Sequence, residues 1–152
     1  MSAAVLSLPT RRATKRFARA LAHRLAPSDL VILSWPLGAG KTFLVRATLR
    51  AMGLPERVAV TSPTFTLVHE YETSLLAIHA DLYRLSGDRD VESLGLLEQR
   101  DLGKVLFVEW GEQYLAVLGG DALVVALGVE PRTAMLRPTG PRATKLADSL
   151  DL

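Results

Sequence analysis

The chain has no cysteine, no long apolar run and no acidic residue ahead of Asp29, and each absence narrows what it can be. Without cysteine there is no disulfide, no thiolate metal site and no cysteine nucleophile, which fits a reducing compartment. Apolar runs such as VLFV and LVIL are far too short to span a bilayer. What remains is 152 residues with 49% hydrophobic content, enough for one globular α/β domain with a real core.

The acid-poor start of the chain carries a concentration of positive charge. Its basic residues are Arg11, Arg12, Lys15, Arg16, Arg19 and Arg24. Apolar residues at helical spacing predict an amphipathic helix from about Thr10 to Leu25, ended by Pro27. The charged face of such a helix usually faces water, but it also suits RNA phosphates. Both interpretations stay open from the sequence.

A strand, a turn of small residues and a helix follow one another from residue 30 onward. LVILS predicts a buried strand, and TFLVRATLRAM predicts a helix that ends at Gly53. Between them, GAGKT matches the end of the phosphate-loop pattern GxxxxGK[ST]. Small residues let backbone N–H groups approach a phosphate at a helix N-terminus, where the helix dipole favours an anion. The alternative, a simple capped turn, is weaker because strand, loop and helix occur in the required order.

The residues of this loop have expected roles. The predicted nucleotide-binding residues are Leu37, Gly38, Ala39, Gly40, Lys41, Thr42 and Phe43. Lys41 should reach the β- and γ-phosphates, and the Thr42 hydroxyl should bind Mg²⁺. The first glycine of the pattern is replaced by Trp35, and Pro36 after it has no N–H to donate. The loop is therefore altered at its entrance and intact at its base.

A second buried strand, KVLFVEW, places Glu109 where the strand should emerge. Nucleotide sites of this kind use a carboxylate near the metal, at the end of a strand beside the loop strand. Glu109 is therefore predicted as a Mg²⁺ ligand together with Thr42, and the alternative is a surface glutamate. The neighbouring Trp110 either packs near the nucleotide or fills core.

Two further runs, TLVHEYE and LLAIHADLYRL, predict a β-hairpin. Period-two alternation puts His79, Asp81 and Tyr83 on one face of its second strand. That face is either solvent or the active cleft, and solvent is the default for Asp81.

The rest of the chain predicts ordinary elements. RVAV predicts a short strand, and GDRDVESLGLLEQ a helix that begins near Asp88 or Asp90. DALVVALGVE and RTAMLRP predict two antiparallel strands joined near Pro131. Residues 1–138 are expected to form a single P-loop ATPase domain, and residues 139–152 a frayed C-terminal tail.

Four motifs follow one another along the chain: GAGKT, TSPTFTLVHEY, IHADLYRL and VEW. Their order and spacing closely resemble those of the TsaE family, formerly called YjeE. These are bacterial P-loop ATPases needed for the threonylcarbamoyladenosine modification of tRNA. The resemblance covers most of the chain, and SPTFTLV and HxDLYRL are its most specific parts. It implies a P-loop NTPase-like three-layer α/β fold, with a central mixed sheet that includes an antiparallel hairpin. The family loop reads GDLGAGKTT, so this chain departs at Trp35, Pro36 and Phe43.

The resemblance also implies roles for residues near the phosphates. Lys41 binds phosphate, Thr42 and Glu109 hold Mg²⁺, and Asp81 lies in the active cleft. Asp81 and Lys41 are the residues expected to matter for ATP turnover.

Two further positions are implied around the nucleotide. Thr64, with Ser62, belongs to a switch-like segment near the γ-phosphate. Arg132 is expected beside the last strands, near the nucleotide base.

By this resemblance the chain is a subunit that binds and slowly hydrolyses ATP with Mg²⁺. It would act in the cytoplasm with TsaB–TsaD-like proteins. It would contact tRNA indirectly, through that complex, and would contact no membrane. One alternative is a small-molecule P-loop kinase, for which Arg84 and Arg89 are the available lid residues. Another is an interaction module that has lost its nucleotide.

Overall fold

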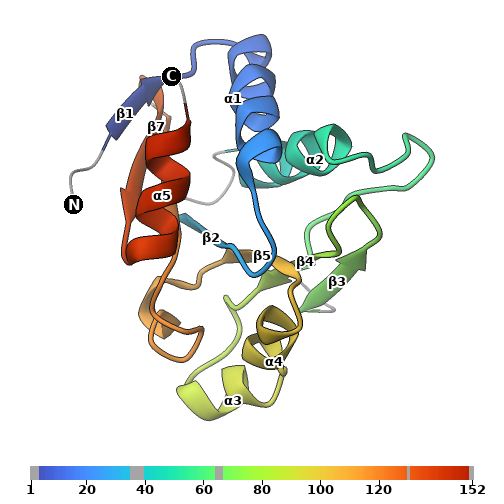
Figure 1. The fold of residues 1–152 in the computed structure, drawn as a ribbon, viewed down its shortest axis with the longest axis vertical. Helices are drawn as coiled ribbons and strands as arrows, with labels where there is room; N and C mark the ends of the chain where they lie inside the picture. The colour runs from blue at the N-terminus through green and yellow to red at the C-terminus, as the bar shows by residue number, and fades with distance from the viewer. Residues whose placement is uncertain (1–3, 35–39, 64–66, 130, 151–152) are drawn as a thin grey trace.

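The computed structural model describes residues 4–34, 40–63, 67–129 and 131–150. The predicted nucleotide-binding residues Leu37, Gly38, Ala39 and Thr64 lie outside this part of the chain. Over the described residues the centre of the molecule is a seven-stranded sheet (Figure 1). Its strands are β1 (Ala4–Ser7), β2 (Leu30–Ser34), β3 (Val68–Tyr71), β4 (Ala77–Asp81), β5 (Val105–Glu109), β6 (Leu123–Val129) and β7 (Arg132–Pro138).

The sheet is mixed, with strand order β1-β7-β6-β2-β5-β4-β3. The four central strands β6, β2, β5 and β4 run parallel, while β3, β7 and β1 are each antiparallel to their neighbours. Parallel strands end at the same edge of a sheet, so Ser34, Asp81 and Glu109 finish side by side. Asp81 is directly opposite Glu109 in the register. This edge is where ligands bind in open α/β sheets.

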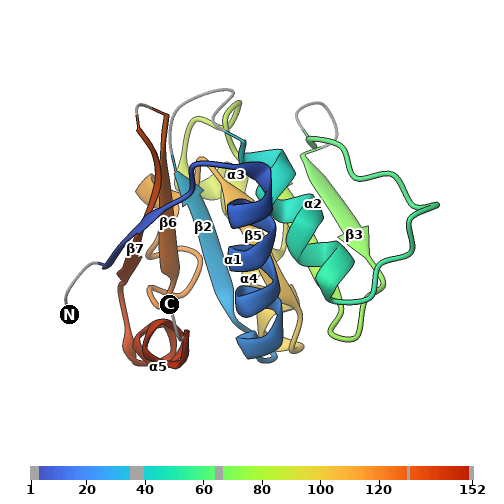
Figure 2. The ribbon, with the colours of Figure 1, turned by 90° about the horizontal axis from the view of Figure 1, so that it is seen from above.

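Helices cover both faces of the sheet (Figure 2). One face packs against α1 (Arg11–Arg24), α2 (Lys41–Ala51) and α5 (Pro141–Ser149). The other packs against α3 (Asp88–Glu92), α4 (Leu96–Asp101) and the 3₁₀ turn η1 (Glu112–Tyr114). Because the central strands are covered on both faces, β2 and β5 are apolar up to their last residues, Ser34 and Glu109, rather than alternating. The predicted three-layer α/β fold with a mixed sheet and hairpin is confirmed.

The basic N-terminal helix forms close to where the sequence predicts it. The Thr10 hydroxyl accepts a hydrogen bond from the amide of Ala13 at 3.1 Å and so caps the helix. Phe17 and Leu21 lie one turn apart on the buried face. No helix within the described ranges is long and apolar enough to cross a membrane.

Two of the smaller expectations are wrong. RVAV forms no strand, and its residues belong to an irregular connection between α2 and β3. The single helix expected from Asp88 is two short helices, because Gly95 adopts a left-handed conformation with φ of 72°.

The expectation of a frayed tail after residue 138 is also wrong for residues 139–150. Residues 141–149 form α5, which buries Ala143 and Leu146 against the sheet. Both carboxylate oxygens of Asp121 accept hydrogen bonds from backbone amides at the start of α5, those of Arg142 (2.8 Å) and Ala143 (2.9 Å). The capping residue lies 21 and 22 positions before the two amides that it accepts from, so no local pattern reveals it.

Candidate functional site

The candidate site lies where β2, β4 and β5 end and α2 begins. Lys41, the first residue of α2, is buried, and its Nζ lies 3.7 Å from Oε1 of Glu109. The same ammonium is 4.6 Å from the centre of the Trp110 ring. Within the described part of the chain, Nζ has no hydrogen-bond acceptor although it is shielded from solvent. A buried ammonium normally has such an acceptor, so its position suits an incoming anion.

Glu109 is held from its other side by a histidine. Nε2 of His79 lies 2.6 Å from Oε2 of Glu109, and His79 is completely buried on β4. The second ring nitrogen, Nδ1, has no hydrogen-bond partner among the described residues. The sequence placed His79 on the same strand face as Asp81, but gave no sign that it contacts Glu109.

Asp81 is buried rather than solvated, so the default expectation of a solvent-facing side chain is wrong. Its Oδ1 accepts a hydrogen bond from the backbone amide of Tyr83 at 3.0 Å. Its own amide donates to the carbonyl of Leu67 at 2.9 Å, which ties the end of β4 to the segment before β3. Asp81 thus stands beside Glu109 at the edge where the cleft was expected.

The start of α2 has the geometry of an anion-binding helix end. Gly40 precedes Lys41 with φ of 92°, a left-handed conformation that favours glycine. A Cβ at Gly40 would lie 3.8 Å from Nη2 of Arg132, so this exposed arginine borders the loop's end. Thr42 is half-buried in the first turn of α2.

Phe43 is placed differently from its neighbours in the loop. Its ring faces α1, with the guanidinium carbons of Arg11 and Arg46 at 5.5 and 5.4 Å from the ring centre. Only its backbone amide, in the first turn of α2, is placed to serve an anion at the helix end.

An aromatic pair forms one wall of the site. The rings of Tyr83 and Trp110 lie 4.9 Å apart, tilted by 54°. Trp110 has φ of 60°, unusual for a residue with a bulky side chain. Strained backbone of this kind persists where the surrounding structure holds it, often at functional sites. This backbone conformation sets the Trp110 ring over Lys41. The sequence had left the role of Trp110 open.

The donors at this edge suit a hard cation. No group of three or more His, Asp or Glu side chains gathers as a metal site in the described ranges. A cation here would therefore depend on few protein ligands, which is how Mg²⁺ is usually held beside phosphates. Oε1 of Glu109 pairs with Nζ of Lys41 at 3.7 Å, a distance too long for a hydrogen bond. The carboxylate of Glu109 and the hydroxyl of Thr42 thus fit the predicted ion chemically.

The fold and this site together define a P-loop-type α/β domain, with a lysine at a helix N-terminus facing a strand-end carboxylate. Residues 8–134 match the family model described as "Threonylcarbamoyl adenosine biosynthesis protein TsaE". The chain belongs to the TsaE family.

Individual relatives agree with this assignment. The proteins named tRNA threonylcarbamoyladenosine biosynthesis protein TsaE from Rickettsia felis and Aquifex aeolicus are 39% and 41% identical, over 71% and 66% of this chain. The alignments cover 63% and 71% of those two proteins, so the chain spans a little under two thirds of the Rickettsia felis protein. The crystal structure of Bacillus subtilis YdiB superposes with a TM-score of 0.81 at 25% identity, covering 98% of this chain and 94% of YdiB.

Proposed function

We propose that this chain binds Mg-ATP at the carboxyl edge of its sheet and hydrolyses it slowly, as a subunit of the machinery that makes threonylcarbamoyladenosine in tRNA. The observation that carries the proposal is Lys41: a buried ammonium at the N-terminus of α2 with no hydrogen-bond acceptor among the described residues. A phosphate oxygen would supply that acceptor, and the dipole of α2 would add to the attraction.

The residues around Lys41 have complementary tasks. Lys41 would move from its ion pair with Glu109 to the phosphates, which frees Oε1 of Glu109 for the cation. Thr42 would supply a hydroxyl oxygen beside it. Mg²⁺, when bound, would neutralise phosphate charge and orient the terminal phosphoryl group. Trp110 would keep water away from the ammonium because its ring covers Nζ.

We expect hydrolysis to be slow because the carboxylates of Glu109 and Asp81 already have partners. Glu109 is bound by His79 and Lys41, and Asp81 accepts the amide of Tyr83. A general base needs a free oxygen within reach of the attacking water. Asp81 is the carboxylate best placed to act as this general base, and the residues around it would have to rearrange for turnover. We expect this step to depend on partner proteins.

The partners would be TsaB–TsaD-like proteins in the cytoplasm, with the nucleotide state of this chain controlling their association. Reconstitution tests this directly: the chain, a TsaB–TsaD pair, unmodified tRNA and the modification substrates are combined with Mg-ATP. The modified nucleoside is then measured by mass spectrometry. We expect product with the wild type and none with Lys41→Ala. Equal product with Lys41→Ala, or without this chain, would contradict the proposal.

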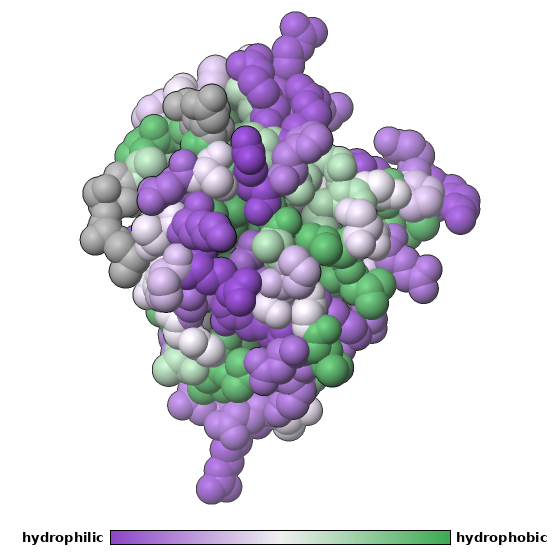
Figure 3. Space-filling view, in the orientation of Figure 1, coloured by the Kyte–Doolittle hydropathy of each residue, from purple (hydrophilic) through white to green (hydrophobic). Residues whose placement is uncertain are grey.

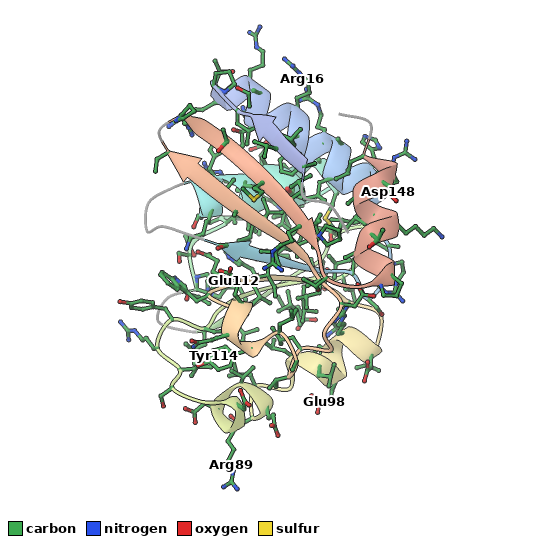
Figure 4. The ribbon with its side chains drawn as sticks, turned by 90° about the vertical axis from the view of Figure 1, so that its left-hand side faces the viewer. Arg16, Arg89, Glu98, Glu112, Tyr114 and Asp148 are labelled. Carbon is green, nitrogen blue, oxygen red and sulfur yellow. The ribbon has the colours of Figure 1, made fainter. Side chains whose placement is uncertain are left out.

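The two alternatives are tested in the same preparation. A kinase needs arginines over the phosphates, but Arg89 projects from α3 at the far end of the molecule (Figure 4). Rapid phosphoryl transfer from ATP to a nucleoside or sugar would nevertheless establish the kinase. An interaction module would bind the TsaB–TsaD pair with equal affinity in the wild type and in Lys41→Ala, with or without ATP.

A further inference from the structure

A groove of about 490 Å³ runs between α1 and α2 on the outer surface of the molecule. Its lining includes the basic residues Arg11, Lys15, Arg19, Arg46 and Arg50 and the ring of Phe43. Hydrophilic side chains gather over α1 in the space-filling view (Figure 3). Five of the lining residues are basic and one is acidic, so the groove is strongly cationic.

The positive charge of the groove is hardly neutralised by the protein. The one acid, Glu56, pairs with Arg50 at 3.6 Å and is 92% exposed. The remaining cations, Arg11, Lys15, Arg19 and Arg46, make no ion pair with any described residue. Arg11 and Arg46 instead lie over the ring of Phe43, with their guanidinium carbons 5.5 and 5.4 Å from its centre.

This arrangement works against the stability of α1. The first turn of α1 contains no acid and begins with two arginines, although the helix dipole disfavours cations at that end. Arg11, Lys15 and Arg19 follow one another at intervals of four residues, and like charges at this spacing repel. A row of cations that costs stability and forms no ion pair with a described residue points to an external anion.

The spacing of the cations fits a polyanion rather than a single small anion. Arg11 and Arg19 are eight residues apart, about 12 Å along the helix at 1.5 Å per residue. A nucleic-acid strand presents its phosphates as a regular row of negative charges, so a row of three cations over about 12 Å can meet more than one phosphate at once. Four of the five cations are arginines, whose planar guanidinium pairs well with phosphate oxygens.

We propose that this groove binds the sugar–phosphate backbone of tRNA directly. The proposal rests on the tRNA-modification function proposed above, and it does not require that the chain bind ATP. Phe43 is two residues after Lys41 in α2, so RNA in the groove would contact the helix that carries the phosphate site.

The test compares two triple variants with the same change of charge on the surface. The groove variant is Lys15→Gln with Arg19→Gln and Arg46→Gln. The control is Arg12→Gln with Arg16→Gln and Arg24→Gln, exposed α1 residues that do not line the groove. Figure 4 shows Arg16 projecting outward from α1. Each variant lowers the formal net charge of +2 by three, to −1. Circular dichroism melting curves establish that both variants fold.

Binding of an unmodified tRNA transcript is measured by fluorescence anisotropy over a salt series, without nucleotide. We expect the groove variant to bind roughly tenfold or more weakly, with a salt slope smaller by about two to three, and the control to lose far less. No binding by the wild type at low salt would overturn the proposal, as would equal losses in both variants. A groove variant that binds tRNA normally but no longer joins a TsaB–TsaD pair would assign the groove to an acidic protein surface and would also overturn it. Because ATP is absent, failure here is separate from failure of the ATPase proposal.

Discussion

The contact between His79 and Glu109 predicts a measurable loss of stability when the histidine is removed. Both residues are buried, and Nε2 of His79 lies 2.6 Å from Oε2 of Glu109. His79→Leu leaves that oxygen with no other hydrogen-bond partner in the described part of the chain. Hydrogen bonds to charged groups contribute about 1.5–3 kcal/mol. We therefore expect the free energy of unfolding to fall by about 1.5–3 kcal/mol.

Urea unfolding followed by circular dichroism measures this change, provided that the m-value stays constant. His23→Leu is the matched control, since His23 is exposed on α1 and should change stability by less than about 0.5 kcal/mol. His79→Gln retains an N–H donor and should lose less than His79→Leu. In a double-mutant cycle with Glu109→Leu, we expect a coupling energy of at least about 1 kcal/mol. A loss below about 0.5 kcal/mol for His79→Leu, or strictly additive single changes, would refute the reasoning.

Three other predictions concern the metal, the pH dependence and the fold. Glu109→Ala should weaken Mg-ATP binding more than Mg²⁺-free ATP binding in calorimetry, because only the cation loses a ligand; equal losses would remove Glu109 from that role. Burial raises the pKa of Asp29 above its ordinary 3.8, an effect opposed by a backbone hydrogen bond and by Arg142. The folded state therefore binds the Asp29 proton more tightly than the unfolded state does. The free energy of unfolding should fall as pH rises from 3.8 through the folded pKa. Asp29→Asn should flatten this part of the plot of unfolding free energy, measured in urea, against pH. Arg100 donates to three backbone carbonyls, so Arg100→Met should cost about 2–4 kcal/mol in urea unfolding, and an unchanged midpoint would contradict this.

The central sheet was predictable because its signals are local. Continuous apolar runs gave β2 and β5, two strand-like runs close together gave the β3–β4 hairpin, and apolar residues at helical spacing gave α1. The position of Lys41 at the start of α2 also follows from a short motif, since strand, small residues and helix are contiguous in the sequence.

The features that sequence reasoning missed depend on distant partners. α5 is capped by Asp121, and β1 is a strand because it pairs with β7 at the sheet edge. Neither partner is visible in a local pattern. In the same way, the contact of His79 with Glu109 joins residues 30 positions apart on neighbouring strands. Period-two alternation predicts which face of β4 carries His79. The residues that this face contacts depend on the parallel pairing of β4 with β5.

Binding of the ATP phosphates by Lys41 is the central step of the proposed function. Calorimetric titration of Mg-ATP into the wild type, Lys41→Ala and Lys145→Ala tests it most directly. Lys145 is an exposed lysine on α5, and its replacement controls for the loss of one positive charge. We expect the wild type and Lys145→Ala to bind equally and Lys41→Ala to show no binding. Absence of binding to the folded wild type, or undiminished binding by Lys41→Ala, would contradict the account.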